Sequence, residues 1–194
     1  MTFKPTIEKE EIARMPVENF DGSIVVVDDI QGVADAIRQL RAAETVGFDT
    51  ETRPNFSRYQ HHKIALIQLA TQNVCFLFRI NRLGAFPPQL AEFINDSTVK
   101  KVGLSLQDDF HSMRRRCAVE PANFIDLQDI VHNYGIEELS LQKIYAIVFG
   151  KKISKRSRLS NWDADSLTPA QQQYAALDAW ACLHLYQHLL TADN

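Results

Sequence analysis

Residues 46–51 read VGFDTE, and this short stretch decides how the rest of the chain is interpreted. It has the character of a buried strand, in which successive side chains point to opposite faces. Val46 and Phe48 then lie on one face, whereas Asp49 and Glu51 lie on the other. Two ionised carboxylates on one face of a central strand are costly to desolvate unless a cation or a positive partner compensates them. The pair therefore predicts a metal site.

The composition is that of one large globular domain. Its 194 residues, 45% of them hydrophobic, are enough for one continuous core, so we expect a single domain over residues 1–194. Within it, residues 1–22 form an extension packed on or near the rest. A net charge of −3 excludes a generally basic surface, so any grip on an anionic polymer must be local. Three isolated cysteines and a charged N-terminal segment predict a cytoplasmic protein that does not enter a membrane.

The hydrophobic pattern predicts an α/β fold, in which a mixed central sheet is flanked by helices. The expected strands are Ile24–Val27, Thr45–Glu51, Ile64–Ala70, Val74–Ile80 and Lys100–Leu104, the second to fourth of them forming an antiparallel meander. Helices are expected near Met15, from Asp28 to Arg41, and over Pro88–Asn95, Gln107–Cys117, Ile125–Tyr134 and Ser140–Phe149, with a long one from Thr168 onward.

The last helix carries a further acid on its buried side. Thr168 as N-cap and Gln171 three residues later form a capping box, which fixes the register of the helix. Asp178 then lies in the middle of the apolar stripe, where an acid is paired, hydrogen-bonded or bound to a cation. Tyr174, one turn earlier, lies over Asp178. The two either serve one site or simply pack together.

The helix expected at Gln107–Cys117 offers two neighbouring acids. If Phe110 and Met113 face the core, Asp109 lies on the shoulder of the buried stripe, whereas Asp108 points well away from it. We therefore take Asp109 as the site residue. Asp108 instead suits the positive end of the helix dipole.

Four carboxylates on one side of a sheet suit two hard divalent cations, Mg²⁺ or Mn²⁺, roughly 4 Å apart. Histidines and cysteines are not spaced for zinc. A pair of divalent cations is suited to phosphoryl transfer, in which one activates a water and the other stabilises the leaving oxygen. Hydrolysis of a phosphodiester is thus the predicted chemistry.

Four ordered segments of the chain resemble the motifs of the DEDD-type 3′–5′ exonucleases, the group of ribonuclease D and the exonuclease domain of the Werner-syndrome helicase. They read VGFDTET, KIALIQLA, KVGLSLQDDF and LSNWDADSLTPAQQQYAALDAW. The similarity runs from about Val25 to Leu190. It implies a ribonuclease H-like fold and release of nucleoside 5′-monophosphates from a 3′ end.

The resemblance also implies a role for each acid. Asp49 would bridge both cations, Glu51 and Asp178 would complete one site, and Asp109 would serve the other. Tyr174 matches the tyrosine that positions the attacking water in the DEDDy branch. The sister branch has a histidine five residues before the last acid, where this chain has a glutamine.

Two positive segments are candidates for substrate binding. Lys155, Arg156 and Arg158 precede the last motif and suit phosphate contacts, although a solvated surface loop is the alternative. Arg53 and Phe56 follow the first motif and suit contact with a terminal nucleotide, although an ordinary edge loop would look the same. Close relatives often have an aromatic or apolar residue where this chain has Thr52.

The expected partner is the 3′ end of DNA or RNA, and two other functions are considered. A catalytically silent nucleic-acid-binding module would not need buried acids. A proofreading or processing subunit of a larger complex is the other, although the usual proofreading branch carries the histidine. Only 16 residues follow Asp178. We therefore expect weak processivity, with substrate grip supplied by this domain, a homo-oligomer or a partner.

Overall fold

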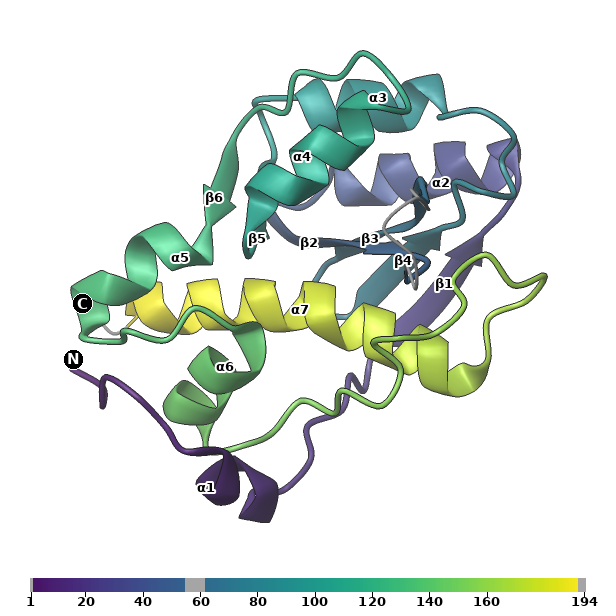
Figure 1. The fold of residues 1–194 in the computed structure, drawn as a ribbon. Coiled ribbons are helices and arrows are strands. Elements are labelled where there is room, and N and C mark those ends of the chain that lie inside the picture. Colours follow the sequence, from purple (N-terminus) through teal and green to yellow (C-terminus); the bar gives the residue numbers. More distant parts are fainter. Residues whose placement is uncertain (1, 55–61, 192–194) are drawn as a thin grey trace.

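The computed structural model describes residues 2–54 and 62–191, and in them a mixed sheet lies between two layers of helices (Figure 1). Its strands are β1 (Ser23–Val27), β2 (Thr45–Thr52), β3 (Ile64–Ala70), β4 (Val74–Phe78), β5 (Lys100–Gly103) and β6 (Phe124–Asp126). They are arranged in the order β1-β4-β3-β2-β5-β6. β2 runs antiparallel to β3 and parallel to β5. The predicted meander and mixed sheet are confirmed, and the strand with the two acids is central.

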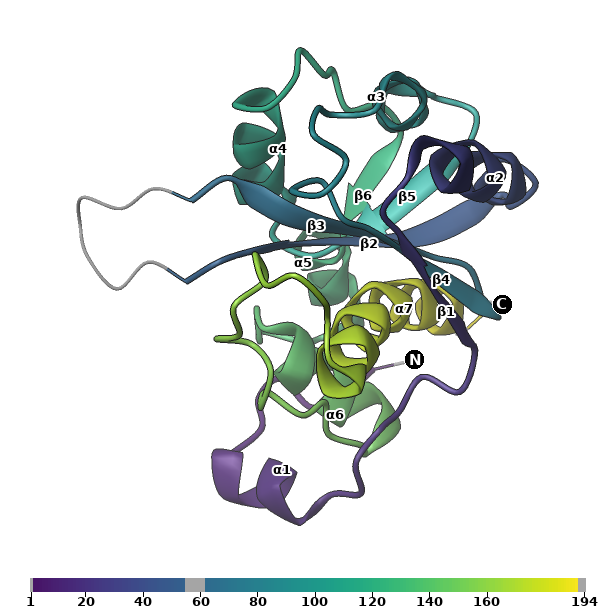
Figure 2. The same ribbon diagram turned by 90° about the vertical axis from the view of Figure 1, so that its right-hand side faces the viewer.

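The helices divide between the two faces of the sheet (Figures 1 and 2). One face is covered by α2 (Ile30–Leu40), α3 (Pro88–Asn95) and α4 (Leu106–Arg114). The other is crossed by α7 (Pro169–Thr191), with α5 (Leu127–Ile130), α6 (Leu141–Phe149) and α1 (Lys9–Arg14) on the same side. Each layer encloses its own apolar cluster. No helix in the described part of the chain is long and apolar enough to cross a membrane.

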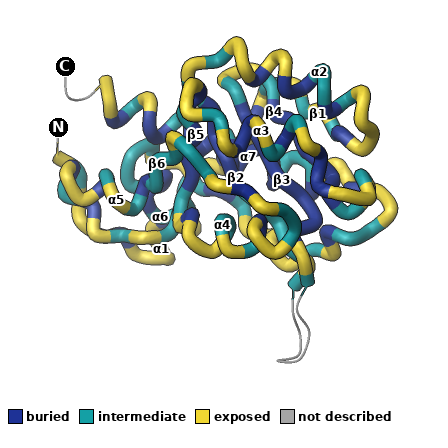
Figure 3. Tube along the Cα trace, turned by 90° about the horizontal axis from the view of Figure 1, so that it is seen from above, coloured by how far each residue is buried: buried dark blue, intermediate teal, exposed yellow. Residues whose placement is uncertain are grey.

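Buried residues are concentrated where α7 meets the central strands (Figure 3). Every residue of β3 is buried, because helices cover both of its faces. One side of α7 packs on β2, β3 and β4, and α6 packs against it too. This explains why apolar residues occur almost all round α7, whereas a helix at the surface keeps them on one stripe.

One sequence prediction about the fold is wrong. The stretch Ile125–Tyr134 was expected to be a helix, but Phe124–Asp126 forms strand β6, which pairs with β5. Only then do α5 and a 3₁₀ helix (Val131–Tyr134) follow. A strand of three residues is too short to show a period of two, so the helical spacing after it dominated the pattern.

The N-terminal segment packs beneath α6. Ile7 and Ile12 are buried against Ala146 of that helix. The backbone N–H of Phe3 donates to the carbonyl oxygen of Tyr134 at 2.9 Å. Residues far apart in sequence thereby form one side of the molecule.

A close backbone contact sets the separation of β2 and α7. A Cβ atom built on Gly47 would lie 1.9 Å from the carbonyl oxygen of Ala179, where no atom fits. Gly47 and Asp49 share one face of β2, and Ala179 follows Asp178 on α7. The missing side chain therefore lets the acid-bearing strand and the acid-bearing helix approach each other.

We expect Gly47→Ala to lower the free energy of unfolding by about 3 kcal/mol, because the new methyl group would clash with backbone atoms of Ala179, which cannot move away as a flexible side chain can. Urea denaturation measures the change. Gly32→Ala in α2 is the matched control, since its Cβ would lie 3.4 Å from the nearest atoms, which belong to the side chains of Asp29 and Val27. That variant should be as stable as the wild type or more so, because alanine favours helix. Equal stability of both variants would contradict this account of the contact.

Candidate active site

Strand β2 presents its two acids to α7. Asp49 lies opposite Gln68 of β3 and Glu51 lies opposite Leu66, on the face that α7 covers. Val46 and Phe48 belong to the apolar cluster on the other side. The alternation predicted from the sequence is confirmed, and the acids face the helix that carries Asp178.

The start of α7 positions Asp178 as predicted. The Thr168 N–H donates to Gln171 Oε1 at 2.9 Å, and the Gln171 N–H donates to Thr168 Oγ1 at 3.3 Å, so the capping box is formed. Asp178, almost three turns later, is 8% exposed. One oxygen each from Asp49, Glu51 and Asp178 lie within 4.8 Å of one another. This is the spacing that a shared cation requires.

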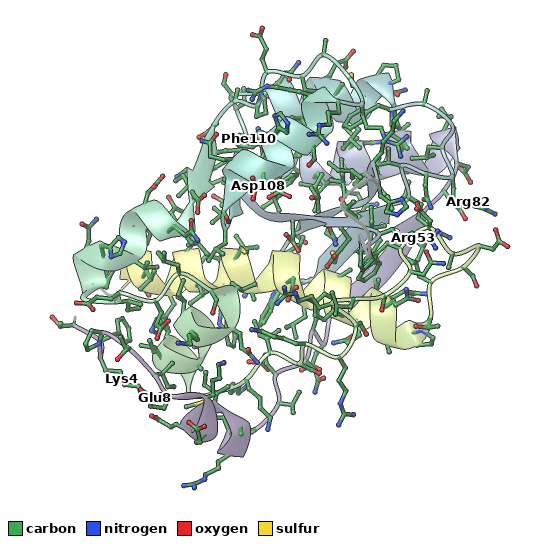
Figure 4. All side chains as sticks on the ribbon, viewed as in Figure 1. Lys4, Glu8, Arg53, Arg82, Asp108 and Phe110 are labelled. Atoms are coloured by element: carbon green, nitrogen blue, oxygen red, sulfur yellow. The ribbon has the colours of Figure 1, made fainter. Side chains whose placement is uncertain are left out.

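Asp109 approaches the cluster from the opposite layer. It lies in the first turn of α4, and its carboxylate accepts a hydrogen bond from the Thr50 hydroxyl. Asp108, marked on α4 in Figure 4, is exposed. Of the two neighbouring acids, Asp109 is thus the one that is partly buried and held against β2. Three of the four acids are gathered together, and the fourth is held beside them by Thr50.

Asp126 helps to position Asp109, and it was not identified from the sequence. Its carboxylate accepts hydrogen bonds from the backbone N–H groups of Ser105 at 3.0 Å and Leu106 at 2.8 Å. These groups lie where α4 begins, and Ser105 is in the left-handed conformation with φ of 62°. Asp126 thereby fixes the start of the helix that carries Asp109. The signal in the sequence was an acid directly after the apolar pair Phe124-Ile125, but the expectation of a helix over Ile125–Tyr134 concealed it.

Burial opposes ionisation of all four acids, and repulsion by the other site acids adds to it at Asp49 and Glu51. Burial is the largest cause in each case. The pKa of Asp49 is raised well above its ordinary value, helped by the charges of Glu51 and Asp178. The pKa of Glu51 is raised to about 9, and those of Asp109 and Asp178 to about 7. Such a set of carboxylates has a strong electrostatic preference for cations.

Tyr174 joins the site directly. Its hydroxyl hydrogen-bonds the Asp178 carboxylate, which lowers the pKa of that acid against the larger effect of burial. Burial and the nearby carboxylates raise the pKa of the tyrosine itself, so it stays a neutral donor. The preceding Gln173 is used elsewhere, because its Nε2 donates to the Phe20 carbonyl oxygen at 3.0 Å.

A cavity of about 440 Å³ opens beside these residues. Tyr174 and Asp178 line it together with Lys155 and Arg158. The charge of Lys155 lowers the pKa of Asp178, and that of Arg158 lowers the pKa of Glu51, although burial outweighs both. The cavity thus combines acids with positive groups that suit a phosphate.

The other predicted substrate residues lie elsewhere. Arg156 lines a neighbouring cavity of about 180 Å³, which Glu18, Ser157 and the shared residue Tyr174 also line. Arg53 is exposed beyond the end of β2, and among the described residues it does not line the larger cavity (Figure 4). Phe56 lies outside the described residues.

Residues 151–165, called here the basic segment, are anchored at both ends. At one end, Lys151 Nζ lies 3.0 Å from Glu18 Oε2, and the Lys152 N–H donates to the Pro16 carbonyl oxygen. At the other, Asp165 Oδ1 accepts from Arg82 Nη1 at 2.9 Å, and its backbone carbonyl accepts from Arg79. Lys155 and Arg158 lie between these anchors.

The raised pKa values predict an unusual pH dependence for the metal-free protein. Between the ordinary carboxyl values near 4 and the raised values of about 7 to 9, the native state holds protons that the unfolded chain has released. The free energy of unfolding therefore falls as pH rises through this window. In EDTA, the melting temperature of the protein should therefore decrease as the pH is raised from about 5 to about 9.

The substitution Asp178→Asn should make that decrease shallower, because it removes one of the repelling charges. Adding Mg²⁺ to the wild type at the alkaline end should restore much of the lost stability, since binding to the native state alone stabilises it. A melting temperature in EDTA that is constant or rises over the window would contradict the assigned shifts.

Comparison with known proteins agrees with this geometry. The family model described as 3′-5′ exonuclease matches residues 24–192. The mouse (Mus musculus) bifunctional 3′-5′ exonuclease/ATP-dependent helicase WRN is 32% identical in an alignment of 184 positions, which covers 90% of this chain and 13% of that protein. The chain thus spans a small part of that relative.

Two solved structures show the same fold. The Nibbler EXO domain of Aedes aegypti superposes with a TM-score of 0.82 at 22% identity, covering 92% of this chain and 94% of that one. Ribonuclease D of Trypanosoma brucei, in complex with RNA U12, gives a TM-score of 0.78 at 21% identity, covering 88% and 63%. The predicted ribonuclease H-like architecture is confirmed. With the family model matched along most of its length, the chain belongs to the 3′-5′ exonuclease family.

Proposed function

We propose that this chain is a metal-dependent 3′–5′ exonuclease, which hydrolyses nucleic-acid phosphodiester bonds and releases nucleoside 5′-monophosphates. The observation that carries the proposal is the gathering of Asp49, Glu51 and Asp178 within 4.8 Å in a chain of this family. A binding module would gain nothing from that arrangement, because buried acids that repel one another destabilise the fold. A silent module is therefore not favoured, and Gln173, at the position where the usual proofreading branch has a histidine, argues against a proofreading subunit.

The residues present fit two divalent cations. The donors are all carboxylate oxygens, the set that Mg²⁺ and Mn²⁺ prefer. Asp49, Glu51 and Asp178 would hold one cation, and Asp109, with Asp49 shared between them, would hold the other. When bound, such cations supply acidification of a water and neutralisation of the charge on the phosphate and the leaving 3′ oxygen.

Tyr174 would orient the attacking water. Its hydroxyl is a neutral donor at the edge of the cavity and is already hydrogen-bonded to Asp178. A donor held in place before the reaction needs no reorganisation when the water approaches the phosphorus. The same hydrogen bond keeps Asp178 in one orientation.

Lys155 and Arg158 would contact the phosphates of the substrate. Both line the cavity that contains Asp178, and both are exposed at its rim. Because the chain has a net charge of −3, such local positive charge is what attracts an anionic polymer. One relative is named as an exonuclease and ATP-dependent helicase, and one structural neighbour is a ribonuclease D in complex with RNA, so we extend the proposal to a 3′ end of either DNA or RNA.

We expect Asp49→Asn and Asp178→Asn each to lower the rate of mononucleotide release by about a thousandfold, because each removes a cation ligand. DNA and RNA oligomers labelled at the 5′ or 3′ end, incubated with Mg²⁺, Mn²⁺ or EDTA, measure the rate and direction. Asp108→Asn is the matched control and should keep wild-type activity, since Asp108 is exposed. Full activity of either site variant would refute the proposed mechanism.

The double substitution Lys155→Ala and Arg158→Ala should raise KM more than it lowers kcat, because it removes contacts with bound phosphates. The slope of log KM against log salt concentration should decrease by up to about 1.4, since two phosphate contacts are lost on a single strand. Arg114→Ala with Arg115→Ala removes the same charge from the exposed end of α4 and should leave the slope unchanged. Equal slopes in all three proteins would place the phosphates elsewhere.

A further inference from the structure

Gln68 in the middle of β3 has no visible reason to be polar. Its side chain is 0% exposed, and within the described part of the chain neither its Nε2 nor its Oε1 has a hydrogen-bond partner. Leaving a buried amide unpaired costs about 1–3 kcal/mol, whereas an apolar side chain here would cost nothing. Every other residue of this strand is apolar. The amide therefore needs a partner that appears only in another state of the site.

The register of the sheet identifies that partner. Gln68 lies directly opposite Asp49 on β2 and opposite Leu77 on β4. Residues paired in this way share one face and have Cβ atoms about 5 Å apart, a distance that a glutamine amide spans. On its other side, Leu77 offers only carbon. The unpaired amide thus lies next to the acid at the centre of the proposed cation site.

Asp49 has spare capacity for such a donor. Its carboxylate accepts from the backbone N–H of Thr50, whereas the neighbouring Glu51, Asp178 and Asp109 are themselves acids. An ionised carboxylate accepts about four hydrogen bonds or metal contacts through its two oxygens. Carboxylates that bind cations are in general oriented by hydrogen bonds from a second layer of residues. Gln68 is the uncharged donor in the position to supply one.

We infer that Gln68 is a positioning residue of the proposed cation site: its Nε2–H donates to the Asp49 carboxylate when a cation occupies the site, and thereby fixes the direction of its oxygens. The inference rests on the proposed function for the presence of cations. It assigns the amide a role in cation affinity and no contact with the nucleic acid. Its consequence is visible without any substrate.

The test is titration calorimetry of the substrate-free protein with Mn²⁺. Gln68→Met keeps the length of the side chain and removes the donor, so the Kd for Mn²⁺ should rise about tenfold or more. Leu77→Met is the matched control, because Leu77 on β4 pairs with Gln68 on the side away from Asp49, and this variant should bind Mn²⁺ as the wild type does. The melting temperature of Gln68→Met in EDTA should be no lower than that of the control, because no paired amide is lost.

Activity gives a second reading, since raising the Mn²⁺ concentration should restore kcat in Gln68→Met. Wild-type Mn²⁺ affinity in this variant would overturn the inference and leave the cation site standing. A melting temperature in EDTA well below that of Leu77→Met would overturn it too, because Gln68 would then serve the fold. Failure of the wild type itself to bind Mn²⁺ would overturn the proposed function together with this inference.

Discussion

Three carboxylates that repel one another lie within 4.8 Å where β2 meets α7, and the surrounding fold holds them there against that repulsion. The contact that makes this possible is between backbones, because the Cα of Gly47 lies beneath the carbonyl of Ala179. Apolar packing on both faces of the sheet supplies the free energy that keeps strand and helix together. The acids therefore occupy positions set by packing, which is the preorganisation that a site for small cations requires.

Hydrogen bonds at a distance from the acids refine their positions. The capping box at Thr168 fixes the register of α7, and Asp178 follows ten residues later, about 15 Å along the helix. Asp126 fixes the first turn of α4 in the same way, and Thr50 then orients Asp109 from the back of β2. Asp178 and Asp109 are thus each held in place by polar residues that lie outside the cluster of three acids.

Much of the fold and the gathered acids could be predicted from the sequence, because their signals are local. Alternation places Asp49 and Glu51 on one face, and the capping box gives Asp178 its side of the helix. The order of the strands in the sheet could not be predicted from such local signals. Strand β6 is three residues long and owes its existence to pairing with β5, a contact between distant segments.

The remaining features of the site depend on tertiary contacts and left little trace in the pattern. Asp126 reads as one more helical acid until β6 is known, and Gln68 reads as a polar interruption of an apolar strand. The basic segment looked uniform, yet Arg156 lines a different cavity from Lys155 and Arg158. Which side of a loop a residue occupies is decided by the anchors of that loop, and those lie far away in sequence.

Because the basic segment has its own two anchors, the shape of the cavity mouth is determined by contacts other than those that position the acids. Residues near Glu18 hold one end of the segment and the arginines after β4 hold the other, while the acids belong to β2, α4 and α7. Lengthening or shortening the loop between the anchors would change which shapes of nucleic-acid strand can enter the cavity, without moving any carboxylate. Substrate preference and hydrolytic chemistry can therefore diverge independently in evolution, the first through one short loop and the second through the rigid layers beneath it.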